Sequence, residues 1–159
     1  MTLPAAELPV GVGWLSLSPL PGRGGDLAGD VAGLVRWQAD LVVSLTEAAE
    51  MTTGDLPGVL AAAGIGWRHV PVPDYGVPGD VAGGIEELSA LLAGGRRIAL
   101  HCMGGCGRSG MLALRLMVQA GEAPADALAR LRAVRPCAVE TPAQLDWAVS
   151  ADQAKRPGA

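Results

Sequence analysis

The feature that most constrains this fold is a glycine-rich loop between two apolar segments. It reads His101-Cys102-Met103-Gly104-Gly105-Cys106-Gly107-Arg108-Ser109. Residues 96–100 before it have the length of a β-strand, and residues 111–118 after it are apolar nearly all round, as in a buried helix. Such a loop brings backbone N–H groups together around an anion, because the first turn of a helix leaves its N–H groups unpaired. The segment therefore predicts a phosphate-sized anion site.

Segments on either side of this loop alternate between strand and helix patterns. We expect strands at 12–18, 41–45, 66–72 and 96–100. We expect a first helix that ends near residue 38, then helices at 46–50, 55–63, 80–93, 111–118, 125–134 and 141–151. Asp26 or Asp30 can cap the first helix. Alternating strands and helices predict an α/β fold with a central, mainly parallel sheet flanked by helices.

Size and charge limit the kinds of partner. The chain has 159 residues, half of them apolar, so we expect one domain over 1–159 with its core at about 10–152. A net charge of -4 and a single lysine argue against nucleic acid or an anionic membrane surface as the partner. No run of 18 uninterrupted apolar residues is present, so we expect no membrane-spanning helix.

Three cysteines, Cys102, Cys106 and Cys137, cannot all pair with one another. Residues 1–7 carry no positive charge ahead of an apolar run, as an export signal would. These features favour a reducing cytoplasm. The bias toward Ala, Gly, Arg and Leu also hints at a bacterial source.

The chemistry of the loop follows from its residue types. Cys102 stands at the entrance, where an anion-binding site stabilises a thiolate, so we expect it to be nucleophilic at neutral pH. Arg108, six positions later, has a planar guanidinium that binds two phosphoryl oxygens at once. Ser109 is placed to donate a hydrogen bond to the sulfur, and His101 to orient the loop. The substrate-binding residues are then Met103, Gly104, Gly105, Cys106, Gly107 and Arg108.

The pattern His101-Cys102-x5-Arg108-Ser109 resembles the signature of the protein tyrosine phosphatase superfamily, in its small dual-specificity branch. Residues 17–22, 42–47 and 73–80 are similar to corresponding stretches of the kinase-associated, cyclin-dependent kinase inhibitor 3-like phosphatases. The resemblance covers most of residues 14–150. It implies a cysteine-dependent hydrolase of phosphotyrosine, with phosphoserine and phosphothreonine as further substrates, that forms a phosphocysteine intermediate. It also implies a phosphorylated protein as partner and neither a cofactor nor a metal.

The resemblance assigns two further side chains. Asp74 matches the family's loop aspartate, which protonates the leaving oxygen and later helps activate water. Asp80 competes for this role, and we assign it instead to a helix cap. Residues 140–144 resemble the family's late segment beside the active site, which implies a residue that positions water. Because Glu140 stands where related sequences often carry glutamine, Gln144 is the better candidate for that role.

The sequence leaves several alternatives open. One is a catalytically weak adaptor that binds phosphoproteins, and another is a lipid or inositol phosphate phosphatase, against which the uncharged Met103 and Cys106 argue. A third is a sulfur carrier of the rhodanese type, which also uses an anion-binding cysteine loop. The physiological substrate and the oligomeric state are not determined by the sequence.

Two loop residues allow more than one interpretation. Cys106 can form a protective disulfide with Cys102 after oxidation, but we favour the simpler view that it fills an apolar slot. Cys137, which follows a proline, is expected in an exposed loop. Arg23 either contacts substrate beside the site or is only solvated.

Overall fold

The computed structural model describes residues 2–79 and 82–154 and has one five-stranded sheet in the order β1-β2-β5-β3-β4. The strands are β1 (Ala6–Val10), β2 (Gly13–Ser18), β3 (Leu41–Ser44), β4 (Gly66–His69) and β5 (Arg97–His101). Four of them are parallel, and β1 alone pairs antiparallel, with β2. The prediction of a mainly parallel sheet in an α/β fold is confirmed.

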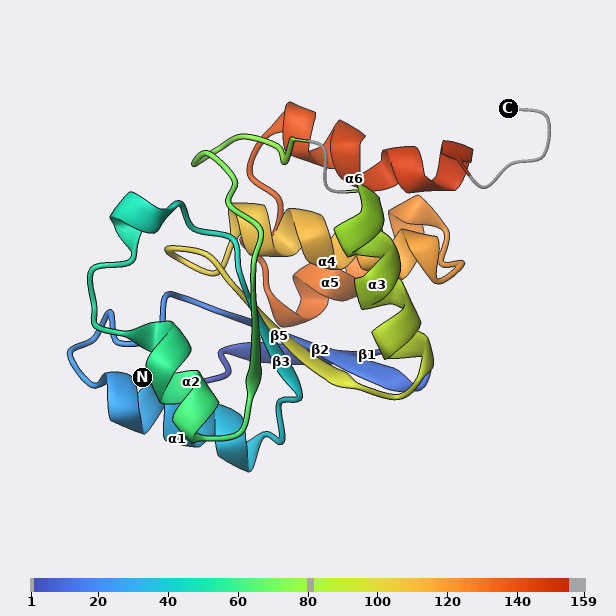
Figure 1. The fold of residues 1–159 in the computed structure, drawn as a ribbon. Coiled ribbons are helices and arrows are strands. Elements are labelled where there is room, and N and C mark those ends of the chain that lie inside the picture. The colour runs from blue at the N-terminus through green and yellow to red at the C-terminus, as the bar shows by residue number, and fades with distance from the viewer. Residues whose placement is uncertain (1, 80–81, 155–159) are drawn as a thin grey trace.

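Helices cover both faces of the sheet (Figure 1). On one face lie α1 (Leu27–Arg36) and α2 (Leu56–Ala62). On the other lie α3 (Ala82–Ala93), α4 (Gly107–Gln119), α5 (Pro124–Val134) and α6 (Pro142–Ala154). A single 3-10 turn, η1 (Ala48–Glu50), stands where the sequence predicted a short helix.

The strand before the loop runs through the middle of the molecule. In β5, Ile98 and Leu100 have no exposed surface and Ala99 is 2% exposed, so both faces of the strand are covered, which explains its continuous apolar run. Helix α4 follows directly and is buried along its length except at Arg115 and Gln119. The loop between them is therefore held at both ends by core elements.

Several boundaries differ from those expected, for local physical reasons. Strand β1 was not among the predicted strands. It tolerates Pro9 because, at the sheet edge, the missing N–H costs no ladder hydrogen bond. Helix α4 begins at Gly107 rather than at 111, because the end of the glycine loop itself forms the first turn.

Of the predicted helix caps, one is confirmed and one is untested. Asp26 caps α1, since its Oδ1 accepts from the Gly29 amide at 2.9 Å. Asp30 instead accepts a hydrogen bond from the Gly22 amide at 2.7 Å. The cap assigned to Asp80 lies outside the described residues.

Within the described residues, no helix combines the length and apolar character needed to span a bilayer.

Candidate active site

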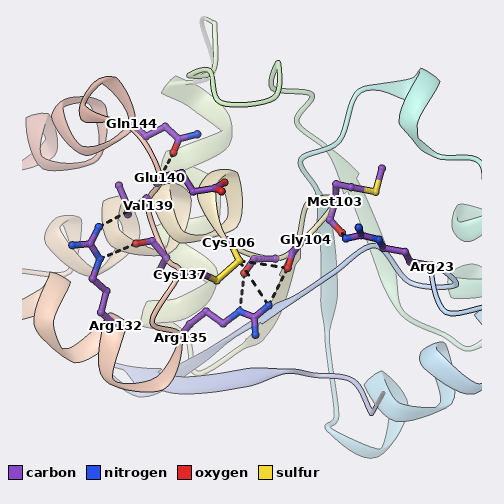
Figure 2. The surroundings of a disulfide bond; sticks show 12 residues. Arg23, Met103, Gly104, Cys106, Arg132, Arg135, Cys137, Val139, Glu140 and Gln144 are labelled. Atoms are coloured by element: carbon purple, nitrogen blue, oxygen red, sulfur yellow. Dashed lines mark hydrogen bonds between the residues drawn. A yellow bond between two sulfur atoms is a disulfide. The ribbon is translucent and has the colours of Figure 1, made fainter.

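The predicted anion loop is present, and its carbonyls are held away from its centre. The Met103 oxygen accepts from Arg23 Nη1 at 2.9 Å and from the Leu20 amide at 3.1 Å. Arg135 donates to the oxygens of Gly104, at 2.9 Å, and Gly105, at 3.0 Å (Figure 2). These contacts fix the outer side of the loop.

The loop amides, in contrast, have no protein partner. Among the residues that the structure describes, no backbone N–H from residue 103 to residue 107 donates a hydrogen bond to a backbone or side-chain acceptor. With the carbonyls tied outward, these N–H groups are available to an anion at the start of α4, where the helix dipole also favours negative charge. The loop thus has the geometry of a candidate anion site, and the prediction that it binds phosphate remains untested.

One glycine of the loop cannot be replaced without distortion. Gly105 has φ +73°, and a Cβ there would lie 2.5 Å from the carbonyl carbon of Ser18. The loop passes this close to the end of β2 because no side chain intervenes. Gly105 thus sets the curvature of the cradle.

Cys102 lies at the bottom of this loop. It is 3% exposed and is the free cysteine of the chain. Ser109 is fully buried, and its Oγ has no hydrogen-bond partner among the described residues. A buried hydroxyl without a partner is costly, so a group that binds in the site, or the sulfur in its charged form, would satisfy it.

The side chain of His101, the last residue of β5, is tied to the neighbouring strands β3 and β4 through two further side chains. Its Nε2 lies 2.5 Å from the Ser44 Oγ, which accepts from Trp67 Nε1 at 2.8 Å. A carbonyl oxygen can only accept, so the Nδ1 atom, which faces the Cys102 carbonyl, carries the imidazole hydrogen, and Nε2 of the neutral ring accepts from the Ser44 hydroxyl. His101 Nδ1 then donates to the Cys102 carbonyl at 3.1 Å. Burial lowers the pKa of His101 to about 4, so the ring is neutral at pH 7.

Arg108 is held by a carboxylate that the sequence analysis did not identify. Its Nη1 and Nη2 each donate to Glu50 at 2.8 Å, and Nη1 also donates to the Val72 carbonyl at 3.0 Å. The pKa of Arg108 lies above its ordinary value, first because of these bonds to Glu50 and further because the charges of Cys102 and Asp74 are near. The same contact lowers the pKa of Glu50. Arg108 is 2% exposed, so its orientation is fixed before any ligand arrives.

Asp74 lies at the rim of the site, on the loop between β4 and α3. Its carboxylate is 56% exposed, and its Oδ1 lies 3.5 Å from Arg108 Nη2. The amide of Tyr75 donates to the same oxygen at 3.1 Å. Asp74 is therefore brought toward the cradle and is open to solvent.

Gln144 is occupied by structural contacts. Its Oε1 accepts from the amides of Glu140, at 2.9 Å, and Thr141, at 3.3 Å, while Thr141 Oγ1 accepts from the Gln144 amide at 3.1 Å. This is a capping box at the start of α6. Gln144 Nε2 also donates to the Gly76 carbonyl at 3.2 Å and so joins α6 to the Asp74 loop. The predicted role in positioning water remains untested.

The structure corrects both interpretations of Cys106. It forms a disulfide with Cys137, 31 residues away, and is neither bonded to Cys102 nor a free apolar filler (Figure 2). The pairing was missed because nothing local in the sequence places residue 137 beside the loop. Cys137 is exposed, as predicted. Disulfides persist mainly in oxidising surroundings, so this bond weakens the reasoning that led to a reducing compartment.

Sequence reasoning also missed the supporting residues. Glu50, Ser44 and Arg135 contact the site from positions 58, 57 and 30 or 31 residues away in the chain. The one available signal was that Glu50 follows the carboxyl end of β3, the edge at which sites of parallel sheets form. No group of three His, Cys, Asp or Glu side chains that could hold a metal is found in the part of the chain that the structure describes.

Fold and loop together define the class of dual-specificity phosphatases. Residues 21–122 match the family model described as "Polymorphic toxin system, DSP-PTPase phosphatase". The chain belongs to this family.

Curated relatives and solved structures agree with this assignment. Cyclin-dependent kinase inhibitor 3 is 38% identical over 76 residues in Rattus norvegicus and 40% identical over 75 residues in Mus musculus. These matches cover 45% of the chain but only 36% of each relative.

Among solved structures, the active form of Tk-PTP is 28% identical, with a TM-score of 0.75 over 96% of this chain and 99% of that one. Kinase associated phosphatase, with its catalytic-site cysteine replaced by serine, is 25% identical, with a TM-score of 0.79 over 93% of both chains.

Proposed function

We propose that this chain is a cysteine-dependent protein phosphatase that hydrolyses phosphotyrosine and also accepts phosphoserine and phosphothreonine. The observation that carries the proposal is the loop whose amides are free and whose carbonyls are tied outward, with Cys102 at its base and Arg108 fixed beside it. The family assignment supports the same reaction class.

In the proposed reaction, the Cys102 thiolate attacks phosphorus and displaces the substrate oxygen, which receives a proton from Asp74. This forms a phosphocysteine and a free alcohol or phenol. Water then attacks phosphorus, gives a proton back to Asp74, and releases inorganic phosphate and the thiolate. Ser109, whose Oγ has no other partner among the described residues, donates to the departing sulfur.

Charge development on the phosphoryl oxygens is met by groups already in place. The loop amides and the Arg108 guanidinium stabilise the equatorial oxygens of the transition state without having to reorganise. Arg108 remains oriented by Glu50 and Val72 during the reaction. His101 holds the start of the loop in position by donating a hydrogen bond to the Cys102 carbonyl, and it acts as a positioning residue.

The lack of charged side chains in the loop favours substrates with a single phosphate, such as phosphorylated proteins. The loop positions between Cys102 and Arg108 carry no charged side chain. A polyphosphorylated inositol headgroup would need additional cations in the cradle. PTPMT1, solved in complex with PI(5)P, is 17% identical, and that likeness concerns the fold alone.

The second candidate function is an adaptor that holds phosphoproteins without turning them over. The observation that favours it is that Asp74 is 56% exposed and meets Arg108 only at 3.5 Å, so its carboxylate is weakly held over the cradle. A cytoplasmic location and a bacterial source are predictions that rest on the sequence alone.

The test is hydrolysis of p-nitrophenyl phosphate in the presence of a chelator, with phosphopeptides as a second substrate panel. We expect turnover by the wild-type chain and none by Cys102→Ser. Retained activity in Cys102→Ser would refute the mechanism, and binding of phosphopeptides without turnover in the wild-type chain would establish the adaptor instead.

A further inference from the structure

The disulfide of the anion loop is not used in the proposed reaction. Cys106 is the fifth residue of the loop, counted from Cys102, and the N-cap of α4. Its partner Cys137 lies between α5 and α6, with Cα atoms 5.1 Å apart. The bond therefore joins the phosphate cradle covalently to a segment outside it.

That segment packs directly against the start of α4. A Cβ on Gly110 would lie 2.6 Å from the Val139 amide nitrogen, and one on Gly107 would lie 2.0 Å from Glu140 Oε1. Arg132 donates to the carbonyls of Ala138, at 2.9 Å, and Val139, at 3.0 Å, which holds the segment itself in place (Figure 2). The disulfide thus connects the loop to a segment that is itself held in place by packing against α4 and by hydrogen bonds from Arg132.

Without the disulfide, fewer contacts would hold this side of the loop. The Val139 amide reaches the Cys106 carbonyl only at 3.4 Å, near the limit of a hydrogen bond. Among the residues that the structure describes, the other hydrogen bonds on this side come from the half-buried side chain of Arg135, which donates to Gly104 and Gly105. Loss of the covalent bond would free the amides of residues 105–107 to depart from the geometry that an oxyanion requires.

The two sulfur sites also differ in accessibility. Cys137 is exposed and Cys106 half-buried, whereas Cys102 is 3% exposed. A soluble thiol reagent can therefore reach the disulfide more readily than the nucleophile.

We propose that the Cys106–Cys137 disulfide is a redox-controlled clamp on the phosphate cradle, closed in the active form and opened by reducing thiols with loss of activity. This rests on the proposed function, because the regulated site is the phosphatase site. The direction is unusual for an enzyme with a cysteine nucleophile, because reductants ordinarily preserve such enzymes.

Opening and closing of the disulfide each transfer two electrons and two protons. Opening transfers two electrons and two protons from a dithiol reductant, which becomes a cyclic disulfide, to the protein, which then carries two thiols. Closing uses a small-molecule disulfide such as glutathione disulfide, which accepts the same electrons and protons and leaves as two thiols. Cys102 keeps its oxidation state in both steps.

The experiment compares both redox forms of the full chain. Protein purified without reductant is divided, and one half is treated with dithiothreitol, which is then removed under nitrogen. Alkylation and mass spectrometry count the free thiols, with one expected in the closed form and three in the opened form. The rate of p-nitrophenyl phosphate hydrolysis and the affinity for tungstate are measured on each form.

We expect kcat/KM of the opened form to be lower by about tenfold, equivalent to about 1.4 kcal/mol of transition-state stabilisation, and to recover with glutathione disulfide. Cys137→Ser, which leaves the loop sequence intact, should show the lower value whether or not it has met reductant. Should Cys137→Ser not fold, the wild-type comparison alone decides.

Equal or higher activity in the opened form, or three free thiols that glutathione disulfide leaves unchanged, would overturn the clamp while leaving the phosphatase intact. If neither form turns over substrate, tungstate decides: tighter binding by the closed form supports the clamp and rejects only the phosphatase. Equal tungstate binding in that case rejects both.

Discussion

The contact between Glu50 and Arg108 allows a sharp test of how the cradle is organised. Replacing Glu50 by glutamine keeps the shape and one acceptor oxygen but removes the charge and turns the second acceptor into a donor that faces Arg108 Nη. The guanidinium, 2% exposed, would keep one bond to residue 50 and its bond to Val72.

The magnitude follows from the burial of this ion pair. Breaking a buried pair costs about 3–5 kcal/mol, and a hydrogen bond to a charged group contributes about 1.5–3 kcal/mol. Since Glu50 retains 22% exposure and glutamine keeps one bond, we expect a loss of about 2–3 kcal/mol in the free energy of unfolding. Misplacement of Arg108 should also lower kcat/KM by about 10²-fold.

The dependence on pH gives a second signature. The pKa of Glu50 is lowered in the folded state by its bond to Arg108, so its stabilising effect is complete above its ordinary pKa of 4.5 and is lost as pH falls through the lowered value. The difference in stability between wild type and Glu50→Gln should therefore be constant near pH 7 and shrink below pH 4.5.

Denaturant unfolding between pH 3 and 7 and steady-state kinetics would measure these effects. The matched control is Glu87→Gln, which removes the same charge from the pair with Arg68, where the side chains are 65% and 33% exposed. It should change stability by less than about 1 kcal/mol. Near-identical stability and kinetics of Glu50→Gln and Glu87→Gln would refute the view that Glu50 orients Arg108.

Four further substitutions test other parts of the site. Asp74→Asn should lower kcat by about 10²–10⁴-fold, measured at pH 6, and an unchanged kcat would remove Asp74 as the acid. Gly105→Ala would place an alanine at φ +73° with its Cβ 2.5 Å from the carbonyl carbon of Ser18, so the free energy of unfolding in denaturant should fall by at least about 2 kcal/mol. Cys137→Ser opens a covalent loop of 31 residues and should cost about 3–4 kcal/mol relative to the oxidised wild type, but nothing relative to the reduced wild type. Because burial lowers the pKa of His101 to about 4, stability should fall as pH drops from 6.5 to 4, and His101→Asn should remove that part of the slope.

The fold and the centre of the site could be predicted because their signals are local. The run from β5 through the glycine loop into α4 is contiguous, and Cys102, Arg108 and Ser109 lie within eight residues. Parallel strands covered on both faces leave apolar runs that are visible in the sequence. Asp74 was found because the resemblance to a known family supplied its position.

The supports of the site could not be predicted, because they come from distant segments through contacts that leave no periodic pattern. Glu50 reaches Arg108 across 58 positions, and Arg23 reaches Met103 across 80. The prediction for Cys106 used only the neighbouring residues of the loop, and these do not indicate that Cys137, 31 positions away, lies beside it. Trp67, Ser44 and His101 form one chain of hydrogen bonds only because β4, β3 and β5 are adjacent in the sheet.

In the proposed mechanism, Cys102 carries the phosphoryl group between the two halves of the reaction. This step is tested by rapid acid quenching of the disulfide form during turnover of p-nitrophenyl phosphate, followed by mass spectrometry of the peptide that contains Cys102. We expect a phosphate on Cys102 that accumulates and then decays in the wild-type chain and never forms in Cys102→Ser. Turnover at an undiminished rate with phosphate on another residue, or on none, would contradict it.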